Sequence, residues 1–289
     1  MEPTIFSFPD TENCPGAIGA VGYRHNGEYH SPLLNEFNLL IIAICHDLED
    51  EVRFEHFING EVRYQLLQVG KNYLRRSIVS GDNSDIVQCF LRGDVIWDVE
   101  GELAEFRSDL IQFRGELRSR RLFKEYSRLL RTHTEAKYHE QASDFMDAYC
   151  SVMQALKHYA NIELIEQGIL PESVTWEQMH SLNPVVYKLF HELTDSKETL
   201  SQRIELLLLT SEFSIVSKME DCCSLLLRVL KSGKETWSVY ELARRPELNH
   251  ASDDLPLVLS KLVHHALIKE VTLAAVDGYG EGREIRYKA

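Results

Sequence analysis

The sequence predicts an α+β protein in three parts, and three observations support that prediction. Up to about residue 118, short apolar runs alternate with turns, including the hairpin signal Asn59-Gly60, a pattern typical of a mixed sheet with a few helices. Residues 119–220 carry apolar side chains at three- and four-residue steps with few glycines, which predicts a helical bundle. Residues 221–289 combine short helices, a glycine-rich loop and two strand-like runs, which predicts a small C-terminal module.

Composition and charge restrict the classes of partner. The chain of 289 residues is 44% hydrophobic and has a formal net charge of −14. Affinity for nucleic acid comes largely from cations that displace counterions, so we expect no strong general binding to DNA or RNA. The six cysteines show no zinc-type spacing, the N-terminus has no basic secretory segment, and no apolar run is long enough to span a bilayer. We therefore expect a cytoplasmic protein with reduced thiols and no membrane association.

The most informative stretch of the chain runs from Gly19 to Ile44. An apolar, strand-like run ends at Gly22-Tyr23, and a polar loop of twelve residues follows, from Arg24 to Asn35. The segment Glu36-Phe37-Asn38 then leads into the apolar run Leu39–Cys45. In a strand, Glu36 and Asn38 point to the same face, because successive side chains alternate.

This arrangement resembles the signature of the nucleotidyltransferase superfamily, in which a glycine-containing turn is followed about a dozen residues later by two acids spaced D-x-D. The resemblance implies that Gly22 and Tyr23 line a nucleotide site and that Glu36 and Asn38 occupy the two catalytic, metal-binding positions. Here Tyr23 stands where serine is expected, Glu36 replaces one aspartate and Asn38 replaces the other. Because Mg²⁺ requires hard oxygen ligands in octahedral geometry, losing one carboxylate weakens its binding heavily. We expect a degenerate site, with Mg²⁺ as cofactor only if the protein is active; the alternative is an ordinary buried strand that starts with two polar residues.

In the nucleotidyltransferase superfamily, a third carboxylate lies on the strand beside the D-x-D pair. The corresponding strand of this chain has no acid beyond its turn. The strand that returns after Asn59-Gly60 offers Glu61 at the turn, and then Gln65 or Gln68 for the vacant position. Asp98, in the apolar run before Gly101, has two interpretations. It caps the turn that follows, or it serves with Glu36 as a replacement metal ligand.

Helical periodicity begins at Leu103 and predicts one helix that continues past Leu117. A basic cluster follows on it and is expected to form a solvated face or to meet a phosphate or an acidic partner. Its members are Arg114, Arg118, Arg120, Arg121 and Lys124. Arg128 and His133 match the R-x4-H pattern of HEPN-type ribonucleases, but so short a pattern often occurs by chance.

The C-terminal module has the order helix, helix, helix, strand, glycine loop, strand, which resembles a winged helix. Its third helix would be the one that enters a DNA groove. That helix starts with Asp253, Asp254 and Pro256, and against these it offers only Lys261, His264 and His265 as groups that could meet DNA. We therefore expect this module to serve a protein partner or self-association and not sequence-specific DNA binding.

The order of the three parts resembles the YgxA-like nucleotidyltransferase-like proteins of bacteria over nearly the whole chain. The resemblance implies a nucleotidyltransferase-like domain at 1–118, a helical, substrate-binding-like domain at 119–220 and a winged-helix-like domain at 221–289. Three hypotheses follow. The first is a pseudoenzyme that binds a nucleotide or other small molecule at the cleft between the first two domains without efficient transfer. The second is an active metal-dependent transferase that uses Glu36, and the third is a winged-helix regulator.

Overall fold

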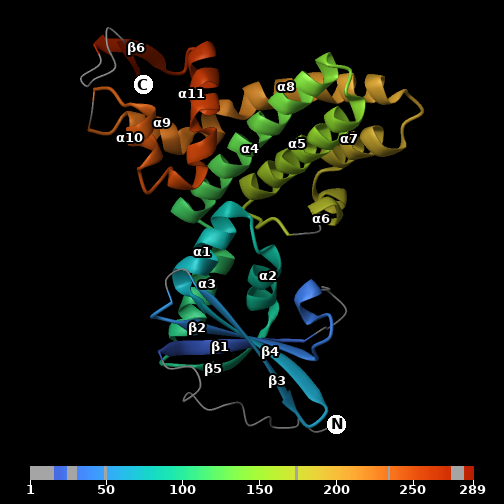
Figure 1. Ribbon diagram of the computed structural model, residues 1–289, viewed down its shortest axis with the longest axis vertical. Coiled ribbons are helices and arrows are strands. Elements are labelled where there is room, and N and C mark those ends of the chain that lie inside the picture. The colour runs from blue at the N-terminus through green and yellow to red at the C-terminus, as the bar shows by residue number, and fades with distance from the viewer. Residues whose placement is uncertain (1–15, 25–30, 49–50, 173–174, 234, 275–282) are drawn as a thin grey trace. The chain divides into compact units, whose positions relative to one another are not determined.

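The computed structural model describes residues 16–24, 31–48, 51–172, 175–233, 235–274 and 283–289. The chain divides into two compact units, Met1–Phe113 and Arg114–Ala289, each of which is described by itself (Figure 1). The predicted α+β class is confirmed, because the first unit holds a mixed sheet and the second is mainly helical. None of the helices in the described ranges is both long and apolar enough to cross a membrane.

A five-stranded mixed sheet forms the centre of the first unit, with the strand order β3-β4-β2-β1-β5. Its strands are β1 (Ala17–Tyr23), β2 (Leu39–Cys45), β3 (Val52–Asn59), β4 (Val62–Gly70) and β5 (Asp94–Asp98). Strands β2 and β4 pair in parallel, whereas the other neighbours are antiparallel. The Asn59-Gly60 signal predicted the β3–β4 hairpin correctly, since Asn59 pairs with Val62 across the turn and Gly60 has a φ of 61°. Strand β2 is buried along its whole length, as its uninterrupted apolar sequence predicts.

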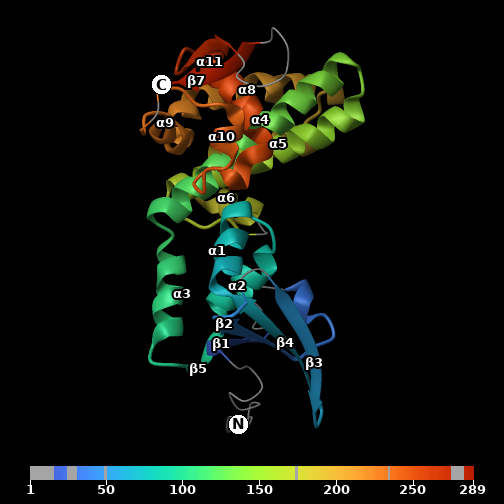
Figure 2. The same ribbon diagram turned by 60° about the vertical axis from the view of Figure 1, so that its left-hand side comes forward.

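Three helices accompany the sheet: α1 (Lys71–Ser80), α2 (Ser84–Arg92) and α3 (Glu102–Gln112). Helices α1 and α2 lie on one side of the sheet, as the two views show (Figures 1 and 2). Phe90 of α2 packs against Phe106 of α3, with ring centroids 6.0 Å apart, and the Arg107 guanidinium donates to the carbonyl of Leu91. These contacts connect the two helices that flank β5.

Gly93 lies where α2 comes closest to β1, and its φ of −71° is open to any residue, so the constraint on it is steric. A Cβ there would overlap a methyl group of Val21 and lie 2.7 Å from the carbonyl oxygen of Gly22. We therefore expect Gly93→Ala to lower the free energy of unfolding by about 1–3 kcal/mol, the usual cost of overpacking. Urea unfolding measures this effect. The control is Gly60→Asn, which meets open space and a backbone conformation that asparagine tolerates, so it should change stability little.

The predicted long helix from Leu103 is interrupted, which corrects the sequence-based expectation. Helix α3 ends at Gln112, Phe113 has a φ of 42°, and α4 (Gly115–Gln141) begins with Gly115 at a φ of 58°. The apolar period continues through the break because Phe113 is itself buried, so periodicity alone did not reveal it. The break coincides with the boundary between the two compact units.

The second unit contains a helical bundle, as predicted. Its helices are α4, α5 (Phe145–Glu166), α6 (Thr175–Leu182), α7 (Pro184–Asp195) and α8 (Leu200–Cys222). Helices α4 and α5 form an antiparallel pair around a short turn at Ala142–Asp144, and α8 packs along both (Figure 1). Thr199 and Gln202 form a capping box at the start of α8, which fixes where that helix begins.

The C-terminal elements are α9 (Ser224–Leu230), α10 (Val239–Ala243), the 3₁₀ turn η3 (Asn249–Asp254), α11 (Leu255–His264) and the hairpin β6 (Lys269–Ala274) and β7 (Arg283–Lys288). Their order is the predicted one, and Ser238 caps α10 in a capping box with Glu241. The glycine-rich loop predicted between the two strands lies outside the described residues, as do residues 1–15. One continuous core joins α4 and α8 to these elements, from Phe123 and Tyr126 to Leu259 and Leu262. The assignment as a winged helix stays a prediction.

Candidate functional site

The two degenerate D-x-D positions lie just before β2, at the edge of the sheet where β4 also begins. Asn38 extends the parallel ladder, because its N–H donates to the Arg63 carbonyl over 2.8 Å. Its side-chain oxygen Oδ1 accepts the Arg63 N–H, also over 2.8 Å. The amide oxygen that would replace a metal-binding carboxylate is therefore used to fix the start of β4 against β2.

Glu36 faces a cation and not a second carboxylate. Its Oε2 lies 3.6 Å from a guanidinium nitrogen of Arg63, and the side chains of Glu36 and Arg63 are 70% and 52% exposed. The same guanidinium lies over the Phe37 ring, 5.7 Å from its centroid, and that ring is 4.6 Å from the His56 ring. Pairs as exposed as this one contribute little to stability, which leaves the arginine free to exchange its partner for a solute anion.

The structure distinguishes between the two glutamines that the sequence offered for the third acidic position. Gln65 pairs with Leu40 across the parallel ladder, so it lies on the same face as Asn38 and Arg63, whereas Gln68 lies on the opposite face. Gln65 is buried, and its Nε2 is 3.3 Å from Nε2 of His56. Its buried Oε1 has no hydrogen-bond partner among the residues that the structure describes. Glu36, Asn38, His56 and Arg63 form a polar cluster, which we call the β2 entrance. Gln65 is the buried residue next to this cluster, two residues beyond Arg63 on β4.

The two residues predicted to line a nucleotide site, Gly22 and Tyr23, lie inside β1 and not in a turn. Gly22 pairs with Ile41 on one side and Asp94 on the other, and Tyr23 pairs with Leu40 and is 2% exposed. A Cβ on Gly22 would lie 2.9 Å from Cδ1 of Ile96, so close packing accounts for this glycine. Half of the loop that follows Tyr23, residues 25–30, lies outside the described residues, so the predicted phosphate approach by its backbone stays a prediction.

Asp98 is not brought together with Glu36. It pairs with Gly19, four residues along β1 from the Tyr23 end, which corresponds to about 13 Å along a strand. Its two carboxylate oxygens accept the N–H groups of Leu103 and Ala104 over 2.9 and 3.0 Å. Both oxygens thus cap the start of α3. This agrees with the first interpretation given for Asp98, that it caps the turn that follows its strand.

These donors do not fit an octahedral magnesium site. The β2 entrance offers one carboxylate, already beside Arg63, and one neutral amide oxygen that holds a backbone N–H. Glu61 is exposed at the tip of the β3–β4 hairpin, and Asp98 is bound elsewhere. Within the described ranges, no group of three or more His, Cys, Asp or Glu side chains is placed to share a metal ion.

The basic cluster of α4 has structural partners, which corrects the expectation of a solvated face. Arg118 donates to the carbonyls of Ile165 and Glu166 at the end of α5, and Arg121 is buried against Glu125. Lys124, together with Arg131 further along α4, binds the buried carboxylate of Asp254, just before α11. Arg120 reaches Asn249 over 3.3 Å, so the side of α4 toward the C-terminal elements is bonded to them.

The R-x4-H match also has a structural explanation. His133 is buried, and its Nε2 donates to the Leu208 carbonyl over 3.3 Å. Burial lowers its pKa, so the ring is held neutral within the bundle. A ring used in this way supports packing of α4 on α8 and is not presented to a substrate.

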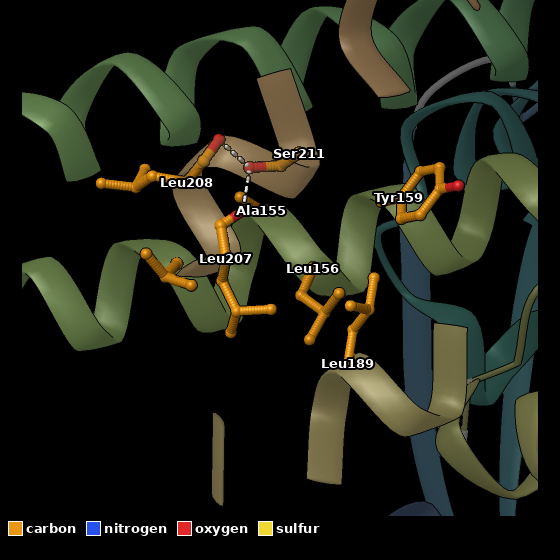
Figure 3. A pocket seen from close by; sticks show the side chains of 8 residues that line it. Ala155, Leu156, Tyr159, Leu189, Leu207, Leu208 and Ser211 are labelled. Carbon is orange, nitrogen blue, oxygen red and sulfur yellow. Dashed lines mark hydrogen bonds between the residues drawn. The ribbon is translucent and has the colours of Figure 1, made fainter. Parts of the chain in front are cut away.

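In the part of the second unit that the structure describes, two hollows can be compared as ligand sites. One lies between α5, α7 and α8, is lined by Leu156, Leu189 and Leu207, and has room for about one water molecule at roughly 10 Å³ (Figure 3). The dashed lines there show Ser211 donating to the carbonyls of Leu207 and Leu208. The other, of about 460 Å³, lies beside the start of α4 and is lined by Arg228, Arg245 and Glu247 among others. Only the second has the volume of a ligand site.

The sequence suggested Glu36 and Asn38 as candidate site residues, but it did not indicate that Arg63 and His56 are their neighbours. The Asn59-Gly60 turn fixes the register of β3 against β4, and so it places His56 opposite Gln65. It carries no information about the parallel register of β4 against β2, which is what brings Arg63 to Asn38. A parallel pairing is made by a remote segment, so no local signal in the sequence could have revealed it.

Comparisons with known proteins agree with this architecture. Residues 17–118 match the family described as nucleotidyltransferase-like, and residues 119–218 match the YgxA-like substrate binding domain. The uncharacterized protein YgxA of Bacillus subtilis (strain 168) is 33% identical over 238 residues, which is 82% of this chain and 81% of that protein. The crystal structure of a nucleotidyltransferase-like protein from Exiguobacterium sibiricum 255-15 has a TM-score of 0.82 at 25% identity and covers 96% of both chains. The chain thus belongs to the YgxA-like family of nucleotidyltransferase-like proteins.

Proposed function

We propose that this protein is a nucleotidyltransferase-fold binding protein that engages a nucleotide or another small anion at the β2 entrance without efficient nucleotidyl transfer. The observation that supports this most directly is the position of Arg63. It pairs with Asn38 on the strand where the family carries its third carboxylate, and it meets Glu36. A guanidinium replaces anionic metal ligands with a fixed cation, and it binds phosphate oxygens directly.

Chemically, such a site can bind an anion but cannot easily activate a nucleophile. In-line transfer uses divalent ions to stabilise both the attacking and the leaving oxygen. An arginine supplies charge and hydrogen bonds to a bound phosphate, yet it cannot bridge two reacting oxygens as a shared metal does. We therefore expect phosphate-bearing ligands to bind without Mg²⁺ and to remain chemically unchanged.

Calorimetry with ATP, GTP, CTP and UTP tests the proposal. We expect at least one of them to bind with an affinity that is unaffected by replacing Mg²⁺ with EDTA. We expect Arg63→Gln to weaken that binding about tenfold or more, because a charge-assisted hydrogen bond is worth about 1.5–3 kcal/mol. Arg53→Gln is the matched control, since Arg53 is an exposed arginine of the same sheet in a pair with Glu51.

The active-transferase hypothesis predicts a different result. Incubation with labelled nucleotide and candidate acceptors would then show Mg²⁺-dependent transfer that is lost in Glu36→Gln. Such a result would overturn the proposal, and absence of heat with all four nucleotides in both buffers would count against nucleotide binding itself.

A further inference from the structure

The outer face of α8 carries an apolar stripe that is exposed among the residues that the structure describes. Leu206, Leu209, Phe213 and Val216 are 48%, 64%, 77% and 45% exposed. Side chains of the opposite face, such as Leu207 and Leu208 in Figure 3, are buried against α5. A helix that is apolar on both faces is typical of one buried on both sides. We call Leu206, Leu209, Phe213 and Val216 the α8 stripe.

The spacing of the α8 stripe is that of a helix seam. Its members recur at steps of three, four and three residues, which are the a and d positions of two successive heptads. That sequence of steps is the same in both directions along the helix. A second copy of α8 running antiparallel therefore places Leu206 against Val216 and Leu209 against Phe213, twice, about a two-fold axis. A stripe with this symmetry is complementary to itself.

The charges beside the α8 stripe and its exposed area bear on whether a second copy of the chain can pack there. Glu212 flanks the stripe, and its carboxylate is 2.8 Å from Nζ of Lys137, so this acid brings its own counter-charge. Glu205 is exposed on the same flank, and its charge adds to the repulsion between two copies. The four side chains expose on the order of 400 Å² per copy, which is comparable to the largest apolar patch of a typical monomer. Pairing them buries about 800 Å² in total, which is below the range of stable, specific interfaces and corresponds to a weak, transient association.

We propose that two copies of this chain associate through their α8 stripes in an antiparallel, two-fold arrangement. The interface is small, so the dimer is weak, with a dissociation constant in the micromolar range. It depends on burial of apolar surface and works against the net charge of −14 on each chain. Added salt therefore tightens it, because salt screens repulsion between the copies.

Analytical ultracentrifugation of the full chain from about 1 to 200 µM tests the proposal. We expect a monomer–dimer equilibrium that tightens between low and moderate NaCl concentrations, and at least a tenfold weaker dimer for Phe213→Glu with an unchanged melting temperature. Met146→Glu is the matched control, since Met146 is 70% exposed on α5 outside the stripe. Tyr240→Glu, at a 67% exposed position of α10, tests association through the C-terminal module.

Cross-linking distinguishes the antiparallel arrangement from a parallel one. In a Cys14→Ser and Cys150→Ser background, the double variant Leu206→Cys with Val216→Cys should form intermolecular disulfides under mild oxidation. Leu206→Cys alone should not, because the two copies of residue 206 would be about 15 Å apart along the helices. A wild-type chain that stays monomeric at 200 µM, a dimer that survives Phe213→Glu, or one that is lost in Tyr240→Glu instead overturns the proposal.

Discussion

Glu125→Gln is expected to lower the free energy of unfolding by about 3–5 kcal/mol, because it removes the carboxylate charge that a buried guanidinium faces. In α4, Glu125 is 1% exposed, and its Oε1 lies 2.6 Å from a guanidinium nitrogen of Arg121, whose side chain is 6% exposed. Its Oε2 lies 2.7 Å from Nδ1 of His158 on α5. Burial raises the pKa of the Glu125 carboxyl, but Arg121 and His158 outweigh that effect and hold the pKa at about 2. The carboxylate thus stays charged inside the bundle.

The double variant Arg121→Met with Glu125→Leu removes both charges. Comparing its free energy of unfolding with that of Glu125→Gln separates the effect of removing one charge from the contribution of the whole pair. Apolar replacements of both partners often restore stability, so we expect this variant to unfold at a higher urea concentration than Glu125→Gln. Circular dichroism at 222 nm follows the loss of helix, most of which belongs to the second unit. Glu51→Gln, in an exposed pair with Arg53, is the control and should leave the transition unchanged. A transition of Glu125→Gln that coincides with wild type would show that the buried pair contributes nothing.

This network also shows which features the sequence did and did not predict. Arg121 and Glu125 are one helical turn apart, so their pairing is visible in the sequence as an i, i+4 pair. Their burial is not, because it depends on α5 covering that face of α4 and bringing His158 to the carboxylate. The sequence-based expectation of a solvated basic face failed for that reason. Long-range packing, and not composition, decided which arginines are exposed.

The fold was easier to predict than the site. Alternation, the Asn59-Gly60 turn and helical periodicity are local signals, and they predicted the β3–β4 hairpin and the helical bundle correctly. The β2 entrance depends on a parallel register between β2 and β4, which is set by distant segments. Gly22 illustrates the limit. Its type suggested a phosphate-binding turn, whereas in the structure its missing side chain makes room for Ile96.

A second large effect is expected from pH, through His250 of η3. Its Nε2 donates to the Arg120 carbonyl over 2.9 Å. Burial, reinforced by the charges of Arg120 and Lys124, lowers the pKa of this ring to about 3. In the unfolded chain the ring has its ordinary pKa near 6.5, so acid stabilises the unfolded state by protonating it. Stability is therefore fully present above about pH 6.5 and is lost as the pH falls toward 3, by roughly 3–5 kcal/mol in all.

His250→Gln tests this expectation, because an amide can still donate to Arg120 but does not titrate. Between pH 7 and pH 4.5 we expect the wild type to lose about 2–3 kcal/mol of stability that the variant retains, as measured by urea unfolding at each pH. The variant keeps a residual slope, since burial lowers the pKa of His133 in the same direction. Glu125 titrates in a lower range, because its folded pKa of about 2 lies below the ordinary value near 4.3. Its contribution is thus lost only below about pH 4.5, and an equal slope in wild type and variant above that pH would exclude His250 as the cause.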